Sequence, residues 1–193
     1  MKFLIAGLGN IGDEYAGTRH NIGFDIADTL LFSIGKNADQ VIRFESARYA
    51  FVAEAKFRGK TMVIIKPATY MNLSGNAVNY WMQKENIPKE NILVLSDDLA
   101  LPFGTLRVRS KGGDGGHNGL KHIAETLGSS DYPRLRFGIG SEFNKGSQVN
   151  YVLGKWSEEE KKGLPDKLIT SVEIIKSFVM AGIELTMTNY NKL

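Results

Sequence analysis

The residues that could do chemistry in this chain begin with His20, which stands in a polar, glycine-rich stretch after the apolar run at 3–6. The chain has three histidines and no cysteine, and a histidine in such a loop is a candidate general base. That role needs a carboxylate or a carbonyl on the second ring nitrogen to fix the tautomer. We expect Asp97 to supply it, because Asp97 follows the apolar run at 92–95 and would lie at the same edge of a sheet. A turn or helix-cap role for the pair Asp97–Asp98 is the alternative.

Three asparagines, Asn10, Asn72 and Asn118, also fall where an expected strand gives way to a helix. Asparagine is common in turns for conformational reasons, so each of them alone is a weak signal. Together, at one sheet edge beside His20, they predict a group of neutral amides. Amides of this kind can hold a peptide backbone or a carbonyl without adding charge.

The segment at 7–12 reads GLGNIG and matches the glycine fingerprint of dinucleotide-binding folds. That fingerprint needs a helix to open at the third glycine, so that the helix N-terminus meets the pyrophosphate. Here Asp13 and Glu14 follow directly and would repel a phosphate, and no helical pattern begins until Ile22. We therefore interpret the glycines as a turn that lets the backbone pass close to a neighbouring element.

Metal and covalent chemistry are not indicated. Without cysteine there is no thiolate site, and His117 and His122 lack a carboxylate at ligand spacing. The nucleophile-elbow pattern G-x-S-x-G does not occur. We expect no metal and no cofactor.

Strand and helix patterns alternate along the chain. We expect strands at about 2–7, 47–56, 60–66, 91–96, 104–109, 135–139 and 148–153. We expect helices at about 22–35, 74–86 and 118–127, and a helical C-terminal third that opens on a capping box at Ser157 and Glu160, with Ser74 as a further N-cap. The pattern predicts an α/β fold: one domain over residues 1–193, a three-layer sandwich with a mixed, twisted central sheet flanked by helices.

The charge is mildly basic, with 24 Lys and Arg against 21 Asp and Glu over 193 residues. The basic residues gather at Arg107, Arg109, Lys111, Lys121, Arg134 and Arg136. This cluster fits a polyanionic partner, and a solvated basic face is the alternative reading. No apolar stretch is long enough for a membrane span and no export signal appears, so we expect a cytoplasmic protein, and a monomer.

Six separate motifs run from near the start of the chain to position 140. They are GLGN at 7–10 with Gly12 and Tyr15, TRHN at 18–21, KPATYMNLSG at 66–75, DDL at 97–99 with LP at 101–102, GGHNGLK at 115–121, and RLRFGIG at 134–140. Together they resemble the bacterial-type peptidyl-tRNA hydrolases almost end to end. The tail TNYN at 188–191 also looks like the end of that family's chains.

The resemblance implies an activity, namely hydrolysis of the ester that joins a nascent peptide to the 3′-terminal ribose of a tRNA. It implies His20 as the base that activates water and Asp97 as its orienting partner. Asn10, Asn72 and Asn118 would position the peptide, the ester carbonyl and the water. No metal or organic cofactor is implied.

The remaining site residues also follow from the resemblance. Met71 would line the peptide groove, and Tyr15 would lie at its edge near the terminal nucleotides. Arg109 and Arg136 would meet the tRNA backbone and its 5′ phosphate, together with the helix start at 117–118. The partner is then peptidyl-tRNA, and the process is translation, in the rescue of stalled ribosomes.

The chain departs from the family pattern at three positions. Ala100 stands where an aspartate is usual, Ser96 where a histidine or an aromatic residue is usual, and Asp114 adds negative charge to the Gly-rich loop. The main alternative function is a non-catalytic RNA-binding module on the same fold. A nicotinamide-dependent oxidoreductase and an exopeptidase are more distant alternatives.

Overall fold

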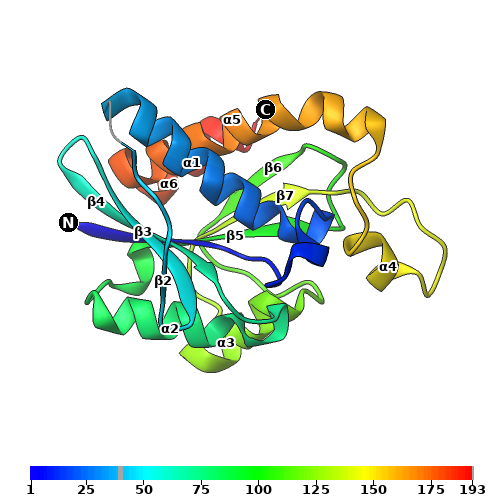
Figure 1. Cartoon of the computed structure of the whole chain (residues 1–193), viewed down its shortest axis with the longest axis horizontal. Coiled ribbons are helices and arrows are strands. Elements are labelled where there is room, and N and C mark those ends of the chain that lie inside the picture. Colours follow the sequence, from blue (N-terminus) through cyan, green and yellow to red (C-terminus); the bar gives the residue numbers. More distant parts are fainter. Residues whose placement is uncertain (39–40, 193) are drawn as a thin grey trace.

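The computed structural model describes residues 1–38 and 41–192 and contains one seven-stranded sheet (Figure 1). The strands are β1 (Lys2–Gly7), β2 (Glu45–Ala47), β3 (Ala50–Phe57), β4 (Lys60–Pro67), β5 (Ile92–Asp98), β6 (Leu106–Arg109) and β7 (Arg134–Gly138). They lie in the order β2-β3-β4-β1-β5-β7-β6.

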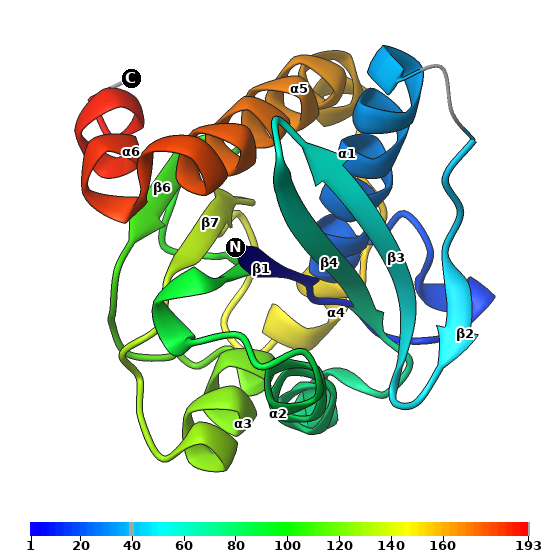
Figure 2. The same cartoon turned by 90° about the vertical axis from the view of Figure 1, so that its left-hand side faces the viewer.

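Helices cover both faces of this sheet. They are α1 (Ile22–Ala38), α2 (Ser74–Lys84), α3 (Asn118–Leu127), α4 (Gln148–Val152), α5 (Glu158–Ala181) and α6 (Ile183–Tyr190). Helices α1, α5 and α6 pack on one face and α2 and α3 on the other, which Figure 2 shows with the sheet between the two layers. Each face has its own apolar core. The predicted three-layer α/β sandwich is confirmed.

The four central strands, β4, β1, β5 and β7, run parallel to one another, while β2, β3 and β6 pair antiparallel. The sheet is therefore mixed, as predicted. Because parallel strands end at a common edge, the loops after β1, β4 and β5 emerge together. Three short 3₁₀ turns lie in or after these loops: η1 (Asp13–Tyr15), η2 (Arg19–Asn21) and η3 (Met71–Leu73). A fourth, η4 (Lys89–Asn91), precedes β5.

The glycines of the first loop allow β1 and α1 to approach closely. A Cβ atom on Gly7 would lie 2.2 Å from the carbonyl oxygen of Gly23, and a Cβ on Gly23 would lie 2.3 Å from the backbone nitrogen of Leu8. Gly9 faces the ring of Phe24 in the same way, with 2.7 Å to its nearest carbon. The glycine pattern therefore serves packing between a strand and a helix, as the sequence suggested, and it fixes both ends of the loop that carries His20.

Two local expectations are wrong. Residues 148–153, predicted as a strand, form helix α4 over Gln148–Val152. The β-branched residues there favour a strand only where a partner strand is available, and this segment lies beyond the edge of the sheet (Figure 1). Ser74 is not an N-cap, because α2 continues directly from the turn η3 and the Ser74 hydroxyl donates to the carbonyl of Met71 at 2.8 Å.

The hairpin turn and the last capping box are confirmed. Arg58 and Gly59 join β3 to β4 with φ angles of 48° and 80°. Ser157 and Glu160 cap α5 reciprocally, with hydrogen bonds of 3.2 and 2.7 Å. Within the described part of the chain, no helix has the length and apolar character needed to cross a membrane.

Candidate active site

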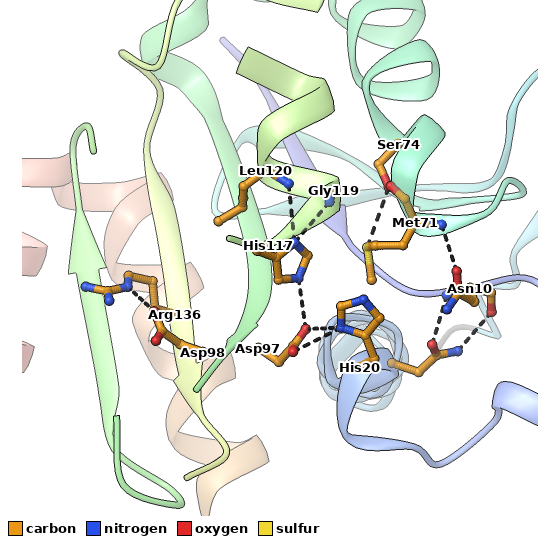
Figure 3. Close-up of polar contacts among 11 residues, drawn as sticks. Asn10, His20, Met71, Ser74, Asp97, Asp98, His117, Gly119, Leu120 and Arg136 are labelled. Atoms are coloured by element: carbon orange, nitrogen blue, oxygen red, sulfur yellow. Dashed lines mark hydrogen bonds and ion pairs between the residues drawn. The ribbon is translucent and has the colours of Figure 1, made fainter. Parts of the chain in front are cut away.

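His20 and Asp97, which are 77 positions apart in the chain, meet at the carboxyl edge of the sheet (Figure 3). His20 lies in the turn η2 after β1, and Asp97 lies near the end of β5. The Nδ1 atom of His20 lies 2.9 and 3.0 Å from the two carboxylate oxygens of Asp97. The predicted contact between the histidine and the carboxylate is therefore present.

A second histidine, His117, also contacts the carboxylate of Asp97. It precedes α3 and caps that helix, because its Nδ1 accepts hydrogen bonds from the backbone N–H groups of Gly119 and Leu120 at 3.1 and 3.3 Å. A backbone N–H can only donate, so the proton of this ring sits on Nε2. Nε2 in turn donates to Oδ1 of Asp97 at 2.9 Å. Both nitrogens of His117 are thus engaged.

The environment of Asp97 keeps it ionised. Its side chain is 3% exposed, and burial by itself would raise its pKa. The interactions with His117 and then with His20 outweigh burial and hold the pKa of this carboxyl well below its ordinary value. A carboxylate only accepts, so His20 must donate from Nδ1. The Nε2 atom of a neutral His20 is then free of a proton and has no hydrogen-bond partner among the described residues.

A pocket of about 400 Å³ opens in front of this group. Its lining includes His20, Asp97, His117, Asn118 and Arg136. Part of its wall comes from the segment 143–152 around α4. The histidine, one of the three predicted amides and one of the two predicted arginines therefore share a single hollow.

Asn10 is buried behind this pocket and organises the loop after β4. Its Oδ1 accepts a hydrogen bond from the backbone N–H of Met71 at 2.7 Å, and its own backbone is held by the side chain of Asn21 at 2.8 and 2.9 Å. Asn10 lines a neighbouring hollow of about 360 Å³. Met71 is also buried, and its side chain points from the turn η3 toward the two histidines (Figure 3). The structure thus joins Asn10 to Met71 but places Asn10 outside the pocket lined by His20.

Neither Asn72 nor Tyr15 lines the pocket that contains His20. Asn72 follows Met71 on the turn η3 and is exposed, like Asn118 at the start of α3. Tyr15 ends the turn η1 and packs edge-on against Tyr70, with 6.5 Å between ring centroids. The amides of Asn72 and Asn118 make no hydrogen bond to the described residues, so both are available to a ligand.

Arginines are paired across the edge strands β6 and β7. The register sets Arg107 opposite Arg136 and Arg109 opposite Arg134. Arg136 makes an ion pair with Asp98 through Nε and reaches the pocket with a side chain that is 27% exposed. Arg109 is exposed on the edge strand and does not line the pocket. The two arginines predicted to meet phosphate therefore lie on adjacent strands, one inside the pocket and one beyond it.

Arg134 is buried, although its position in the basic cluster suggested that it would be exposed. It is 2% exposed and its guanidinium lies 4.1 Å from the centre of the Tyr132 ring. Its two terminal nitrogens donate to the carbonyls of Gly113 at 3.0 Å and Ser130 at 2.7 Å. Arg134 therefore holds the Gly-rich loop against the sheet and is not free to meet RNA.

His20, Asp97 and His117 are also the one group of three metal-binding side chains that comes together in the described residues, with ligand atoms within 4.8 Å of one another. Two imidazoles and a carboxylate are donors that zinc accepts. In this arrangement the donor atoms are hydrogen-bonded to each other, and the proton on Nε2 of His117 would have to leave before that nitrogen could ligate an ion.

Asp25 is a half-buried carboxyl in the hollow beside Asn10. Burial, and then the negative charge of Asp28, raise its pKa to about 7. In the unfolded chain an aspartate titrates near pH 4, at about 3.9. Below that pH the carboxyl is neutral in both states, whereas above pH 7 the folded state must hold a charge in a half-buried position. Asp25 therefore lowers the free energy of unfolding as the pH rises from 4 through 7.

Asp25→Asn is expected to stabilise the protein at pH 8 and to change it little at pH 4. The stability difference should grow across this range by about 1.4 kcal/mol for each unit that separates the folded and unfolded pKa values. Urea unfolding at the two pH values measures it. Asp166→Asn, at an exposed position on α5, is the matched control. A gain from Asp25→Asn that is equal at both pH values would contradict this assignment.

Comparison with known proteins decides the family. The family model described as peptidyl-tRNA hydrolase matches residues 4–193. The chain belongs to the peptidyl-tRNA hydrolase family. It is 56% identical over 192 residues to the peptidyl-tRNA hydrolase of Phocaeicola vulgatus, covering 100% of both chains. It is 58% identical over 191 residues to that of Porphyromonas gingivalis, covering 99% of this chain and 100% of the relative.

Solved structures agree. The crystal structure of peptidyl-tRNA hydrolase from Acinetobacter baumannii has a TM-score of 0.89 and 32% sequence identity, covering 98% of this chain and 94% of that one. The predicted membership of the peptidyl-tRNA hydrolase family is therefore confirmed.

The three departures from the motifs of the peptidyl-tRNA hydrolases have defined surroundings. The backbone N–H of Ala100 donates to Asp98 at 2.8 Å. Asp114 lines the pocket and accepts from the N–H of Gly116 at 2.7 Å, so its charge shapes the Gly-rich loop. The hydroxyl of Ser96 is buried and has no hydrogen-bond partner among the described residues.

Sequence reasoning missed the contact of His117 with Asp97. It placed the helix start at 117–118 against the tRNA backbone, and the contact with Asp97 depends on how α3 is docked against β5. The available signal was the position of His117 at a helix N-cap, since an N-cap histidine has one nitrogen engaged and the other directed away from the helix.

Proposed function

We propose that this chain hydrolyses the ester between a peptide and the 3′-terminal ribose of tRNA, with His20 as the general base. Family membership over residues 4–193 supports the reaction. The observation that carries the role of His20 is the contact of its Nδ1 with an ionised Asp97, which leaves Nε2 free to take up a proton at the pocket. His117 shares that carboxylate but has no free nitrogen, so of the two histidines His20 is the base.

The chemistry needs no covalent intermediate. Nε2 of His20 accepts a proton from water while the water oxygen attacks the ester carbonyl. The same proton then passes to the ribose oxygen as the bond between the carbonyl carbon and that oxygen breaks. A positioned base is typically worth about 10²–10⁴-fold in rate. Asp97 orients the imidazole and stabilises the imidazolium that forms.

The asparagines supply neutral contacts for the peptide. Asn118 offers a free amide in the pocket and Asn72 offers one outside its lining. Asn10 retains the two N–H donors of its side chain while its oxygen holds Met71. Amide donors aimed at the developing oxyanion lower the barrier. Selection of a peptidyl group over a free aminoacyl group follows, because a charged α-ammonium would leave these amides without proper partners. Tyr15 and Met71 would bound the groove.

The tRNA would be held at the edge formed by β6 and β7. Arg136 uses Nε for Asp98, and the outer nitrogens of its guanidinium make no hydrogen bond to the described residues. Arg136 is therefore proposed to meet the 5′ phosphate and Arg109 the backbone. Contacts of this type do not read sequence, which suits an enzyme that must accept many tRNAs. Action as a monomer in the cytoplasm stays a prediction.

The direct test is release of peptide from a purified N-blocked aminoacyl-tRNA by the purified chain. We expect turnover, and we expect the same rate after dialysis against EDTA, because the proposal uses no metal. Binding of tRNA without release of peptide would favour the RNA-binding alternative. Loss of activity on chelation, with recovery on return of an ion, would overturn the metal-free mechanism.

Arg136→Ala is expected to raise KM for the full tRNA substrate, with kcat little changed. The KM for a peptidyl ester of a short 3′-terminal oligonucleotide, which lacks the 5′ phosphate, should rise less. Steady-state kinetics on both substrates measure the contrast. Arg43→Ala, at an exposed site before the opposite edge strand β2, controls for loss of positive charge. An equal rise of KM on both substrates would refute a phosphate contact.

A further inference from the structure

Arg19 precedes His20 in the chain and is fixed by a dense set of contacts. Its Nε and one terminal nitrogen face the two carboxylate oxygens of Glu160 at 3.3 and 2.8 Å. The other terminal nitrogen donates to the carbonyl of Tyr151 at 3.2 Å. The guanidinium also lies 4.3 Å from the centre of the Tyr151 ring and 5.7 Å from that of Trp156.

The backbone around Arg19 is held by the same segment. The N–H of Arg19 donates to the carbonyl of Gly154 at 3.0 Å, and Thr18 forms an antiparallel bridge with Lys155. The Arg19 guanidinium packs closely on this segment, because a Cβ on Gly154 would come within 2.9 Å of it. The turn that carries His20 is thus attached along its back to residues 151–160.

That attached segment continues into the wall of the pocket. The hydroxyl of Tyr151 donates to the carbonyl of Ile139 at 2.6 Å, and its ring lies 5.0 Å from the ring of Phe143. Phe143 lines the same pocket as His20. Arg19 therefore contacts, through Tyr151, a part of the wall of that pocket.

The turn η2 that carries His20 is too short to fix the imidazole without contacts to other segments. The turn η2 has three residues, Arg19–Asn21, and so short a 3₁₀ turn has little rigidity of its own. An arginine that binds a carboxylate through two nitrogens fixes the relative orientation of the two side chains as well as the distance between them. The Arg19 and Glu160 side chains are only 11% and 13% exposed, which limits screening of the pair by solvent.

We propose that Arg19 is a positioning residue for His20. It locks the turn η2 to the segment 139–160, so that the imidazole and the part of the pocket wall formed by this segment keep one relative arrangement. The expected loss of kcat rests on the proposed function of His20 as the base. The expected change in the orientation of the imidazole does not depend on that function.

The test compares Arg19→Met with the double variant Arg19→Met/Glu160→Gln. The single change leaves the carboxylate of Glu160, which is only 13% exposed, without its cation, so it is expected to lower both Tm and kcat. The double variant removes that charge, and a glutamine still accepts from Ser157 in the capping box. We expect its Tm to recover while kcat for an N-blocked aminoacyl-tRNA stays reduced about tenfold or more, with KM changed less. Lys2→Met, which breaks the exposed pair with Glu85, is the control.

A spectroscopic measurement separates this proposal from the proposed function. The Nδ1 proton of His20, hydrogen-bonded to Asp97, should give a low-field NMR signal that exchanges slowly in the wild type and faster in the double variant. Recovery of kcat together with Tm, or an unchanged His20 signal, would overturn the positioning role. An altered His20 signal in a chain whose wild type lacks hydrolase activity would support the positioning role and count against the proposed function alone.

Discussion

Replacement of His20 by alanine is expected to lower kcat at least about a hundredfold, because the proposed reaction loses the group that takes the proton from water. The stability of the fold should change little. Asp97 keeps its hydrogen bond from His117 at 2.9 Å, so the buried carboxylate is not left without a partner. Single-turnover and steady-state assays with an N-blocked aminoacyl-tRNA, together with thermal unfolding, measure both quantities.

A second histidine provides the control for this experiment. His122 lies on α3 and accepts a hydrogen bond from the backbone N–H of Gly75 at 2.9 Å, which ties α3 to α2. His122→Ala should therefore lower Tm and leave kcat nearly unchanged, the reverse of the pattern for His20→Ala. Near-normal turnover by His20→Ala would remove the assignment of the base.

Replacement of Asp97 by asparagine is expected to lower kcat further, by about a thousandfold or more, as loss of an orienting carboxylate does in related catalytic arrangements. Two ring N–H groups, from His20 and His117, converge on this carboxylate. Oδ1 accepts from both rings, whereas Oδ2 accepts from His20 alone. An amide whose oxygen stays on His117 would therefore turn its NH₂ group toward Nδ1 of His20. His20 could then be forced into the tautomer whose Nε2 carries the proton, and that nitrogen cannot act as a base.

The same variant has a signature in stability. The folded pKa of Asp97 is depressed, so the ionised carboxylate stabilises the fold above about pH 4, where the unfolded chain is also ionised. This contribution is lost as the pH falls below that value. The difference in unfolding free energy between wild type and Asp97→Asn should therefore shrink as the pH is lowered from 6 toward 3. A kcat that falls less than about tenfold would contradict the orienting role.

The contact between His20 and Asp97 could be predicted because it depends on a general property of parallel sheets. The carboxyl ends of β1 and β5 lie side by side, so residues that follow those strands must meet. The placement of Met71 near the histidines follows from the same rule, because Met71 comes after the parallel strand β4. The placement of Asn118 does not, because the strand before it, β6, is antiparallel and ends beside the start of β7. The layers were equally predictable, since the apolar spacing of α1 and the continuous apolar strands require helices on both faces.

Other features could not be predicted because they depend on contacts between segments far apart. The helical conformation of residues 148–152 follows from the absence of a partner strand, which no local pattern records. Arg134 was one member of a basic run, and only the approach of the loop at Gly113 explains its burial. The capping contact of His117 is local, but its reach to Asp97 is set by the packing of α3 on the sheet.

The shared carboxylate of Asp97 has a consequence for how a protein of this fold can lose its chemistry in evolution. One side chain contacts two loops of separate origin. A mutation of Asp97 is therefore expected to disturb the loop proposed to meet RNA as well as the proposed reaction. A change at His20 removes the proposed base and leaves the other loop anchored. Lineages that lose the hydrolase activity but keep binding to RNA should therefore lose His20 before they lose Asp97.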